Sequence, residues 1–123
     1  MARILIVDDS RYMRAMLSDI LTGDGHHVAG EAENAMEAVE LYRRLRPDLV
    51  TLDIIMPEVE GMNSIAALKA ILLEDVTAKV VIVSSMGQQD IVAEHMEAGA
   101  RDFIVKPFQP RSVAGAVRRV LEE

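Results

Sequence analysis

The chain has 123 residues, half of them hydrophobic and 27% charged, with no cysteine and a formal net charge of −7 at neutral pH. This length suits one domain with its own core, so we expect residues 1–123 to form a single domain without disulfides or thiolate metal sites. The acidic balance disfavours non-specific binding to nucleic acid or an anionic membrane, and acids as early as Asp8 exclude an N-terminal signal peptide or membrane span, so we expect a cytoplasmic protein.

The first half of the chain alternates short apolar runs with helical patterns. Arg3–Val7 carries four consecutive apolar residues, which is typical of a strand covered on both faces. Ser10 can cap a helix that ends at Gly23–Gly25, because apolar residues recur there at steps of three and four. The elements expected next are a strand at Val28–Ala32, a helix from Asn34 through Leu45 that Pro47 stops, and a strand at Asp48–Asp53.

The second half repeats this alternation. Pro57 and Gly61 interrupt the chain before the next helix, and Pro110 suits the first turn of the last one. The elements expected here are a helix at Ser64–Leu72, a strand at Lys79–Val83, a helix at Gln88–Ala98, a strand at Asp102–Val105 and a helix from Pro110 through Leu121. Strands that alternate with helices throughout a chain predict an α/β fold with a parallel sheet.

Ionisable and hydroxyl side chains stand at the carboxyl ends of four expected strands, where open parallel sheets bind their ligands. An isolated Asp at such a position is most often a helix cap or turn former. Several carboxylates at one edge repel each other unless a cation neutralises them, and Mg²⁺ prefers such oxygen ligands. An Asp can also accept a phosphoryl group, with Mg²⁺ and a Lys balancing the charge. The residues at these ends are Asp8, Asp9, Asp53, Ser84, Ser85 and Lys106.

The motifs around these residues resemble the receiver domain of response regulators, and most closely its stand-alone chemotaxis type. They are Asp8-Asp9-Ser10, Asp53-Ile54-Ile55-Met56-Pro57 with Gly61, Ser84-Ser85 and Lys106-Pro107-Phe108. The match spans essentially the whole chain. The resemblance implies a flavodoxin-like (βα)5 fold, a doubly wound five-stranded parallel sheet with strand order 2-1-3-4-5.

The resemblance also implies a function. Asp53 accepts a phosphoryl group from a histidine kinase, and the phosphoryl group switches binding to a downstream protein, expected to be a motor or adaptor protein in chemotaxis or motility. A phosphatase is a further expected partner. Such a protein is not an enzyme acting on a separate substrate, because it catalyses only its own phosphorylation and dephosphorylation.

Individual residues take roles from the same resemblance. Mg²⁺ is the expected cofactor, held by Asp8, Asp9, Asp53 and the backbone carbonyl of Ile55. The phosphoryl group is contacted by Lys106, Ser84 and Ser85, and the Lys106–Pro107 bond is cis. Ser84 and Phe103 form the switch, in which the ring turns inward as the hydroxyl moves. Apolar Ile55 and Met86 are expected to restrict water and lengthen the life of the phosphoryl group. The partner face is expected to include Gln89, Glu94, Arg101, Phe103 and Arg111.

Other functions are open on the residues alone. A nucleotide- or flavin-binding protein of the same architecture would need a Gly-, Ser- or Thr-rich phosphate loop where Asp8-Asp9 stands. An aspartyl-phosphate phosphatase would need a second acid where Ile55 stands. A phosphorelay intermediate or an isolated receiver of another two-component pathway remains the nearest alternative. We expect no DNA-binding domain, since the chain ends at Glu123 just after the last helix.

Two groups of residues have a plain structural interpretation. The histidines show no metal-ligand spacing and are interpreted as surface or loop residues: His26, His27 and His95. The arginines of the helices, Arg14 among them, are interpreted mostly as solvated charges.

Overall fold

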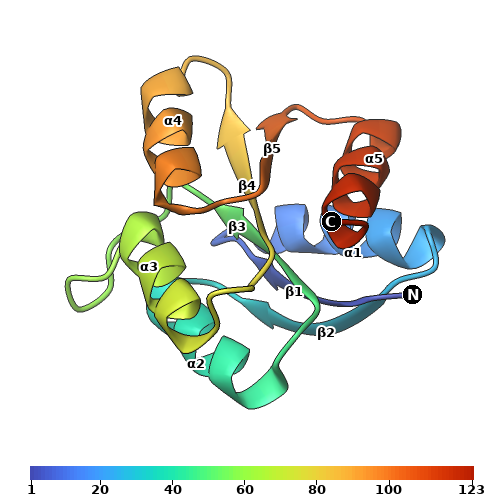
Figure 1. The fold of residues 1–123 in the computed structure, drawn as a ribbon. Coiled ribbons are helices and arrows are strands. Elements are labelled where there is room, and N and C mark those ends of the chain that lie inside the picture. Colours follow the sequence, from blue (N-terminus) through green and yellow to red (C-terminus); the bar gives the residue numbers. More distant parts are fainter.

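A computed structural model describes residues 1–123, in which five parallel strands are flanked by five helices (Figure 1). The strands are β1 (Arg3–Val7), β2 (His27–Ala32), β3 (Leu49–Asp53), β4 (Val80–Ser85) and β5 (Asp102–Lys106). The helices are α1 (Arg11–Gly23), α2 (Ala35–Leu45), α3 (Ser64–Glu74), α4 (Gln89–Ala98) and α5 (Pro110–Leu121). The strand order is β2-β1-β3-β4-β5, which confirms the predicted fold class and topology.

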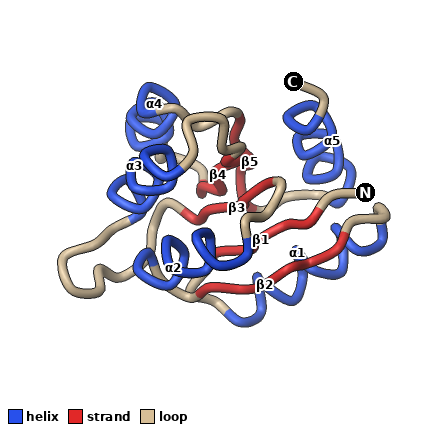
Figure 2. The backbone as a smooth tube through the Cα atoms, turned by 60° about the horizontal axis from the view of Figure 1, so that its bottom comes forward, coloured by secondary structure: helices blue, strands red, loops and turns tan.

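Helices cover both faces of the sheet, as the tube in Figure 2 shows. Ile4 and Ile6 of β1 pack into a core with Leu17 of α1 and Val117 of α5. Leu5 and Val7 of β1 pack into a second core with α2 and α3. Successive side chains of a strand point to opposite faces, so a sheet buried on both faces needs the continuous apolar runs found in the sequence. None of the helices combines the length and hydropathy needed to cross a membrane.

Polar caps set the starts of the first three helices. Ser10 accepts a hydrogen bond from the backbone N–H of Met13 at 3.2 Å, and Asn34 caps α2 in the same way. Asn63, which the sequence analysis did not single out, caps α3 by accepting from Ala66 N at 3.0 Å. These bonds satisfy backbone donors that have no partner inside the helix, so each helix begins at a defined residue behind its strand.

Strand β4 is longer than predicted. The expected strand ended at Val83, whereas the parallel ladder continues until Ser84 pairs with Val105 and Ser85 with Lys106. Serine has no strong strand propensity, and pairing with β5 decides the assignment here. The longer ladder places the β4 hydroxyls level with Lys106 at the carboxyl edge of the sheet.

The interpretation of the histidines as surface or loop residues was wrong for His95, whereas His26 does lie in the loop between α1 and β2. The side chain of His95 is buried against α3, with a relative exposure of 1%. His26 is largely covered and its Nδ1 accepts from the N–H of Ala2 at 3.2 Å. Sequence spacing did not reveal either burial, because both depend on contacts with distant residues.

Candidate functional site

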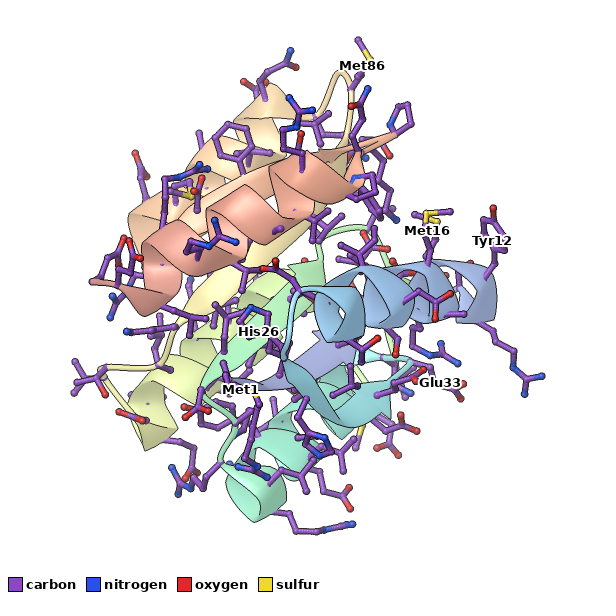
Figure 3. The ribbon with its side chains drawn as sticks, turned by 90° about the vertical axis from the view of Figure 1, so that its right-hand side faces the viewer. Met1, Tyr12, Met16, His26, Glu33 and Met86 are labelled. Atoms are coloured by element: carbon purple, nitrogen blue, oxygen red, sulfur yellow. The ribbon has the colours of Figure 1, made fainter.

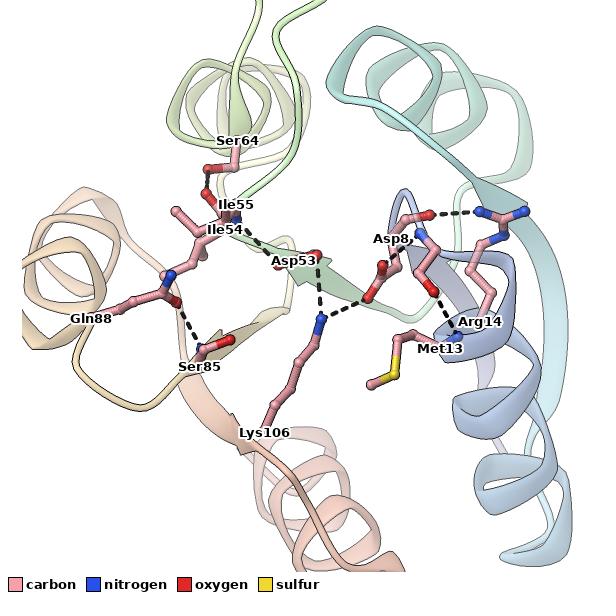
Figure 4. Close-up of polar contacts among 11 residues, drawn as sticks. Asp8, Met13, Arg14, Asp53, Ile54, Ile55, Ser64, Ser85, Gln88 and Lys106 are labelled. Atoms are coloured by element: carbon pink, nitrogen blue, oxygen red, sulfur yellow. Dashed lines mark hydrogen bonds and ion pairs between the residues drawn. The ribbon is translucent and has the colours of Figure 1, made fainter.

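Three side chains from three strand ends meet at the carboxyl edge of the sheet (Figure 4). Lys106 Nζ donates to Asp8 Oδ2 at 3.2 Å and to Asp53 Oδ2 at 3.4 Å. Asp8 and Asp53 are buried, whereas Asp9 is exposed. Carboxylate oxygens of all three acids lie within 4.8 Å of one another. The fold therefore brings together the acids and the lysine that the sequence analysis selected.

Local hydrogen bonds orient the two buried acids. Asp8 Oδ1 accepts from the N–H of Ser10 at 2.9 Å, and Asp53 Oδ1 accepts from the N–H of Ile55 at 3.1 Å. Each bond links an acid to the backbone two residues later, a pattern that Asp forms readily at the start of a turn. In both acids the other oxygen, Oδ2, faces Lys106.

Arg14 is a site residue that the sequence analysis missed. Its guanidinium donates through Nη1 to the carbonyl of Asp8 at 2.7 Å and through Nε to Glu31 at 2.9 Å. The side chain is only 12% exposed, so its interpretation as a solvated charge was wrong. A helical side chain points back toward the helix N-terminus, and Arg14 lies one turn into the helix that follows the acid pair, which is the signal that could have identified it.

The buried acids raise the electrostatic energy of the site. The pKa of Asp53 is raised to about 6 overall. Burial is the largest cause and the charge of Asp8 adds to it, while the N–H of Ile55 and the ammonium of Lys106 act to lower the pKa. Burial acts to lower the pKa of Lys106, but the carboxylates of Asp53 and Asp8 raise it overall. Lys106 is therefore a cation, and one ammonium stands against three carboxylates.

This donor set fits a small divalent cation. The three acids offer only oxygen ligands, which are the ligands Mg²⁺ takes, and it commonly keeps several waters. Asp9 is exposed, so the cluster is open to solvent on one side. The residues could therefore hold Mg²⁺ while leaving coordination positions for water and for oxygens of a bound anion.

Replacing Lys106 tests the charge balance directly. We expect Lys106→Met to lower the free energy of unfolding of the metal-free protein by about 1–3 kcal/mol, because the buried carboxylates of Asp8 and Asp53 lose their partner cation. Urea denaturation in the presence of a chelator measures the change. Lys69→Met is the control, since Lys69 is exposed on α3 and its replacement should stay within about 0.5 kcal/mol. An equal loss in both variants would contradict the argument.

The raised pKa of Asp53 also predicts a pH dependence of stability in the metal-free protein. Between the unfolded value of 3.8 and the folded value of about 6 the folded state holds more protons, so stability falls as pH rises. We expect Asp53→Asn to gain stability over the parent across this interval, by about 1–3 kcal/mol in total, and the difference to level off above it. Denaturation of both proteins from pH 4 to pH 8 measures it, and a constant difference would contradict it.

Ser84 carries a buried hydroxyl without a partner. The residue is 1% exposed and its Oγ makes no hydrogen bond. Beside it, a groove of about 330 Å³ runs between α4 and β5 and is bordered by Phe103, Val92 and Val105. Phe103 is 45% exposed. The arrangement leaves a polar group free to bond to a ligand and leaves space beside an outward-facing ring.

Comparison with known proteins identifies the family. The model for the response regulator receiver domain matches residues 4–118. The chain belongs to this family. Receiver domains related to it are signalling switches.

The receiver domain is similar over its full length to chemotaxis proteins. It is 56% identical over 118 residues to the chemotaxis protein CheY of Thermotoga maritima, covering 96% of both chains. A chain from the CheX–CheY–BeF3–Mg²⁺ complex of Borrelia burgdorferi is 36% identical with a TM-score of 0.88, over 96% of this chain and 87% of that chain. NtrX of Brucella abortus is 31% identical with a TM-score of 0.89; the match covers 98% of this receiver domain and 27% of the longer NtrX chain.

The remaining predicted site residues of the receiver domain lie around its rim. Ser85 is exposed, and its N–H donates to Gln88 Oε1 at 2.7 Å. Ile55 is 50% exposed, and Met86 projects away from the body of the molecule (Figure 3). The Lys106–Pro107 bond is cis. Ile55 therefore adjoins the acid cluster through its bond to Asp53, and Met86 lies in the loop that follows β4.

The predicted partner face spans α4, β5 and α5. Gln89 and Glu94 are exposed on α4, and Arg111 is exposed on α5. Arg101 differs, since it pairs with Glu123 at 2.8 Å. Phe103 of β5 is 45% exposed, so its ring is part of the surface of this face.

Proposed function

We propose that residues 1–123 form a single receiver domain that accepts a phosphoryl group on Asp53 from a histidine kinase, with Mg²⁺ as cofactor. The main support is the position of Asp53. Its carboxylate is buried, is hydrogen-bonded to Lys106 and lies beside two further acids. Family membership and the similarity to a chemotaxis CheY support chemotaxis as the pathway.

The residues of the site divide the chemistry among them. Asp53 attacks phosphorus through one carboxylate oxygen; a P–O bond forms, the bond to the donor breaks, and the donor keeps its electron pair. Lys106, now 3.4 Å from Asp53, stabilises charge on the transferring oxygens. Asp8, Asp9, Asp53 and the carbonyl of Ile55 hold Mg²⁺, which supplies further positive charge to those oxygens. The protein catalyses only gain and loss of its own phosphoryl group.

Phosphorylation of Asp53 then alters the groove between α4 and β5. The free hydroxyl of Ser84 bonds to a phosphoryl oxygen, and Phe103 turns inward beside it; the unpartnered Oγ and the neighbouring space support this step. Ser85, at the end of β4, is a second hydroxyl residue near the phosphoryl group.

The altered face binds a downstream protein, which in a chemotaxis pathway is a motor or adaptor protein. The residues of this face are Gln89, Glu94, Arg101, Phe103 and Arg111. The Borrelia burgdorferi complex holds CheX together with CheY, which supports an additional protein partner for this chain. The family resemblance makes a phosphatase the expected kind.

The proposal is tested by incubating the protein with acetyl phosphate and Mg²⁺ and measuring its intact mass. We expect one added phosphoryl group that is lost at alkaline pH, where acyl phosphates hydrolyse. A protein whose mass does not change under these conditions is not a receiver of this kind.

The lifetime of the phosphoryl group depends on the apolar side chains of Ile55 and Met86. Ile55 and Met86 are apolar where a polar side chain could orient an attacking water, so we expect Ile55→Asn to lose phosphate several-fold faster than the parent. The measurement follows phosphate release at fixed Mg²⁺ after removal of the donor. Val76→Asn, on an exposed apolar residue of the α3–β4 loop, serves as the control. Faster loss in the parent than in Ile55→Asn would refute the role of the apolar rim.

A further inference from the structure

A buried chain of hydrogen bonds joins α4 to the backbone that follows Asp53. His95 Nδ1 bonds to the carbonyl of Ile91 at 2.8 Å, and His95 Nε2 lies 2.9 Å from Ser64 Oγ. The same Oγ lies 2.9 Å from the carbonyl of Ile54, a contact drawn in Figure 4. Ser64 and His95 are 4% and 1% exposed. Three elements, α4, α3 and the β3–α3 loop, therefore meet at one hydroxyl.

The series of hydrogen bonds ends at Ile54, which adjoins the phosphoryl site. Ile54 follows Asp53 directly, and its N–H donates to Val83 O at 3.1 Å. The next residue, Ile55, donates to Asp53 Oδ1 and is the expected source of a carbonyl ligand. A bond to the carbonyl of Ile54 thus restrains the same short segment that shapes the metal site.

The hydrogens available do not suffice for all three bonds. A carbonyl only accepts, so the contact with Ile91 requires the hydrogen of the neutral imidazole to be on Nδ1 and leaves Nε2 as an acceptor. Ser64 has one hydroxyl hydrogen, yet both Ile54 O and His95 Nε2 are then acceptors. The hydrogen can serve only one of them at a time.

Protonation of His95 would remove this competition, because Nε2–H could donate to Ser64 Oγ. Both partners of the ring, however, are uncharged, and the side chain is 1% exposed. A buried charge without an opposite charge is costly. The neutral ring, with a contested hydroxyl hydrogen, is therefore the favoured arrangement.

We propose that Ser64 and His95 are positioning residues for the phosphoryl site, and that the single hydroxyl hydrogen of Ser64, shared between Ile54 O and His95 Nε2, couples that site to α4. The inference rests on the proposed function and deepens it. When the Ser64 hydroxyl donates to Ile54 O, the bond restrains the loop beside Asp53, and α4 loses its hydrogen bond to α3. When the hydroxyl donates to His95 Nε2, the bond restrains α4, and the loop loses its restraint. A ligand that fixes or displaces the Ile54–Ile55 backbone changes this division.

Mg²⁺ affinity provides a test, because two variants should change it in different directions. Ser64→Ala removes the restraint on Ile54, and we expect Mg²⁺ to bind roughly five-fold more weakly, as for the loss of one net hydrogen bond. His95→Phe removes the competing acceptor and leaves the hydrogen to Ile54, so its affinity should equal or exceed that of the parent. A purely structural role predicts that both variants weaken. Titration calorimetry measures all three proteins.

Thr51→Val is the matched control, because Thr51 also carries a buried hydroxyl but makes no hydrogen bond with it. Its Mg²⁺ affinity should equal that of the parent. Equal weakening in Ser64→Ala and His95→Phe, or the same weakening in Thr51→Val, would overturn the proposal.

The ring of His95 provides a spectroscopic readout. Nitrogen NMR of labelled protein should show a neutral ring with its hydrogen on Nδ1, and the Nε2 resonance should shift when Mg²⁺ is added, alone or together with beryllofluoride. In Ser64→Ala that shift should disappear. A doubly protonated ring at neutral pH, or a shift that persists in Ser64→Ala, contradicts the shared hydrogen.

The two proposals can fail separately. Affinity for Mg²⁺ and the nitrogen spectrum with Mg²⁺ alone report on Ser64 and His95 without phosphoryl transfer. Absence of a mass gain with acetyl phosphate would refute the proposed function, whereas a mass gain with unchanged Mg²⁺ affinity in Ser64→Ala would refute only the coupling.

Discussion

Asp53→Asn should abolish the mass gain with acetyl phosphate and Mg²⁺. An amide oxygen is a poor nucleophile toward phosphorus. The only other carboxylate that is both buried and bonded to Lys106 is Asp8, which belongs to the acid pair expected to bind Mg²⁺. We expect a decrease of at least about 10³-fold in the phosphorylated fraction formed per unit time, in line with the loss of an essential nucleophile. Intact-mass measurement over time with parent and variant in parallel gives the result.

Two controls separate this loss from misfolding. Asp19→Asn changes an exposed acid of α1 and should phosphorylate like the parent. Asp53→Asn should itself be at least as stable as the metal-free parent at neutral pH, because it removes a buried charge whose pKa is raised. A mass gain that survives in Asp53→Asn would place the phosphoryl group on another residue.

Removal of Mg²⁺ should have the second largest effect. With excess EDTA, the three carboxylates repel an approaching phosphate dianion and only Lys106 opposes them, so we expect the phosphorylation rate to fall by at least about 10²-fold. Restoring Mg²⁺ above the chelator should restore the rate. The measurement uses the same acetyl phosphate reaction.

A variant pair tests whether the acid cluster is the site of this metal. Asp9→Asn should raise the Mg²⁺ concentration needed for half-maximal phosphorylation, whereas Asp24→Asn, at the far end of α1, should leave it unchanged. Phosphorylation at full rate in EDTA would show that the cluster works without a divalent cation.

The sequence was sufficient for the sheet and for most of the acid cluster, for a physical reason. Strands buried on both faces need unbroken apolar runs, and these runs end in polar residues because the chain leaves the core there. Asp8, Asp53 and Lys106 could therefore be placed at one edge before any contact was known. The family motifs then supplied the strand order, which periodicity alone does not determine.

Residues whose role depends on tertiary partners were beyond sequence reasoning. His95 and Ser64 are far apart in the chain, and nothing in their local patterns marks them as hydrogen-bonded to each other. Arg14 resembles any other helix arginine until Glu31 and the carbonyl of Asp8 are seen beside it. The end of β4 was misplaced for the same reason, since pairing with β5 extends it.

The crowding of buried carboxylates has a consequence for how this protein would evolve under selection. Asp8 and Asp53 share one lysine, and the raised pKa of Asp53 reflects the free-energy cost of burying its charge, with a smaller contribution from the charge of Asp8. Natural proteins generally retain such costs where function requires them. Selection for heat resistance alone, in a metal-free library, should therefore enrich neutral residues at position 53, and the survivors should be robust folds that no longer carry a signal.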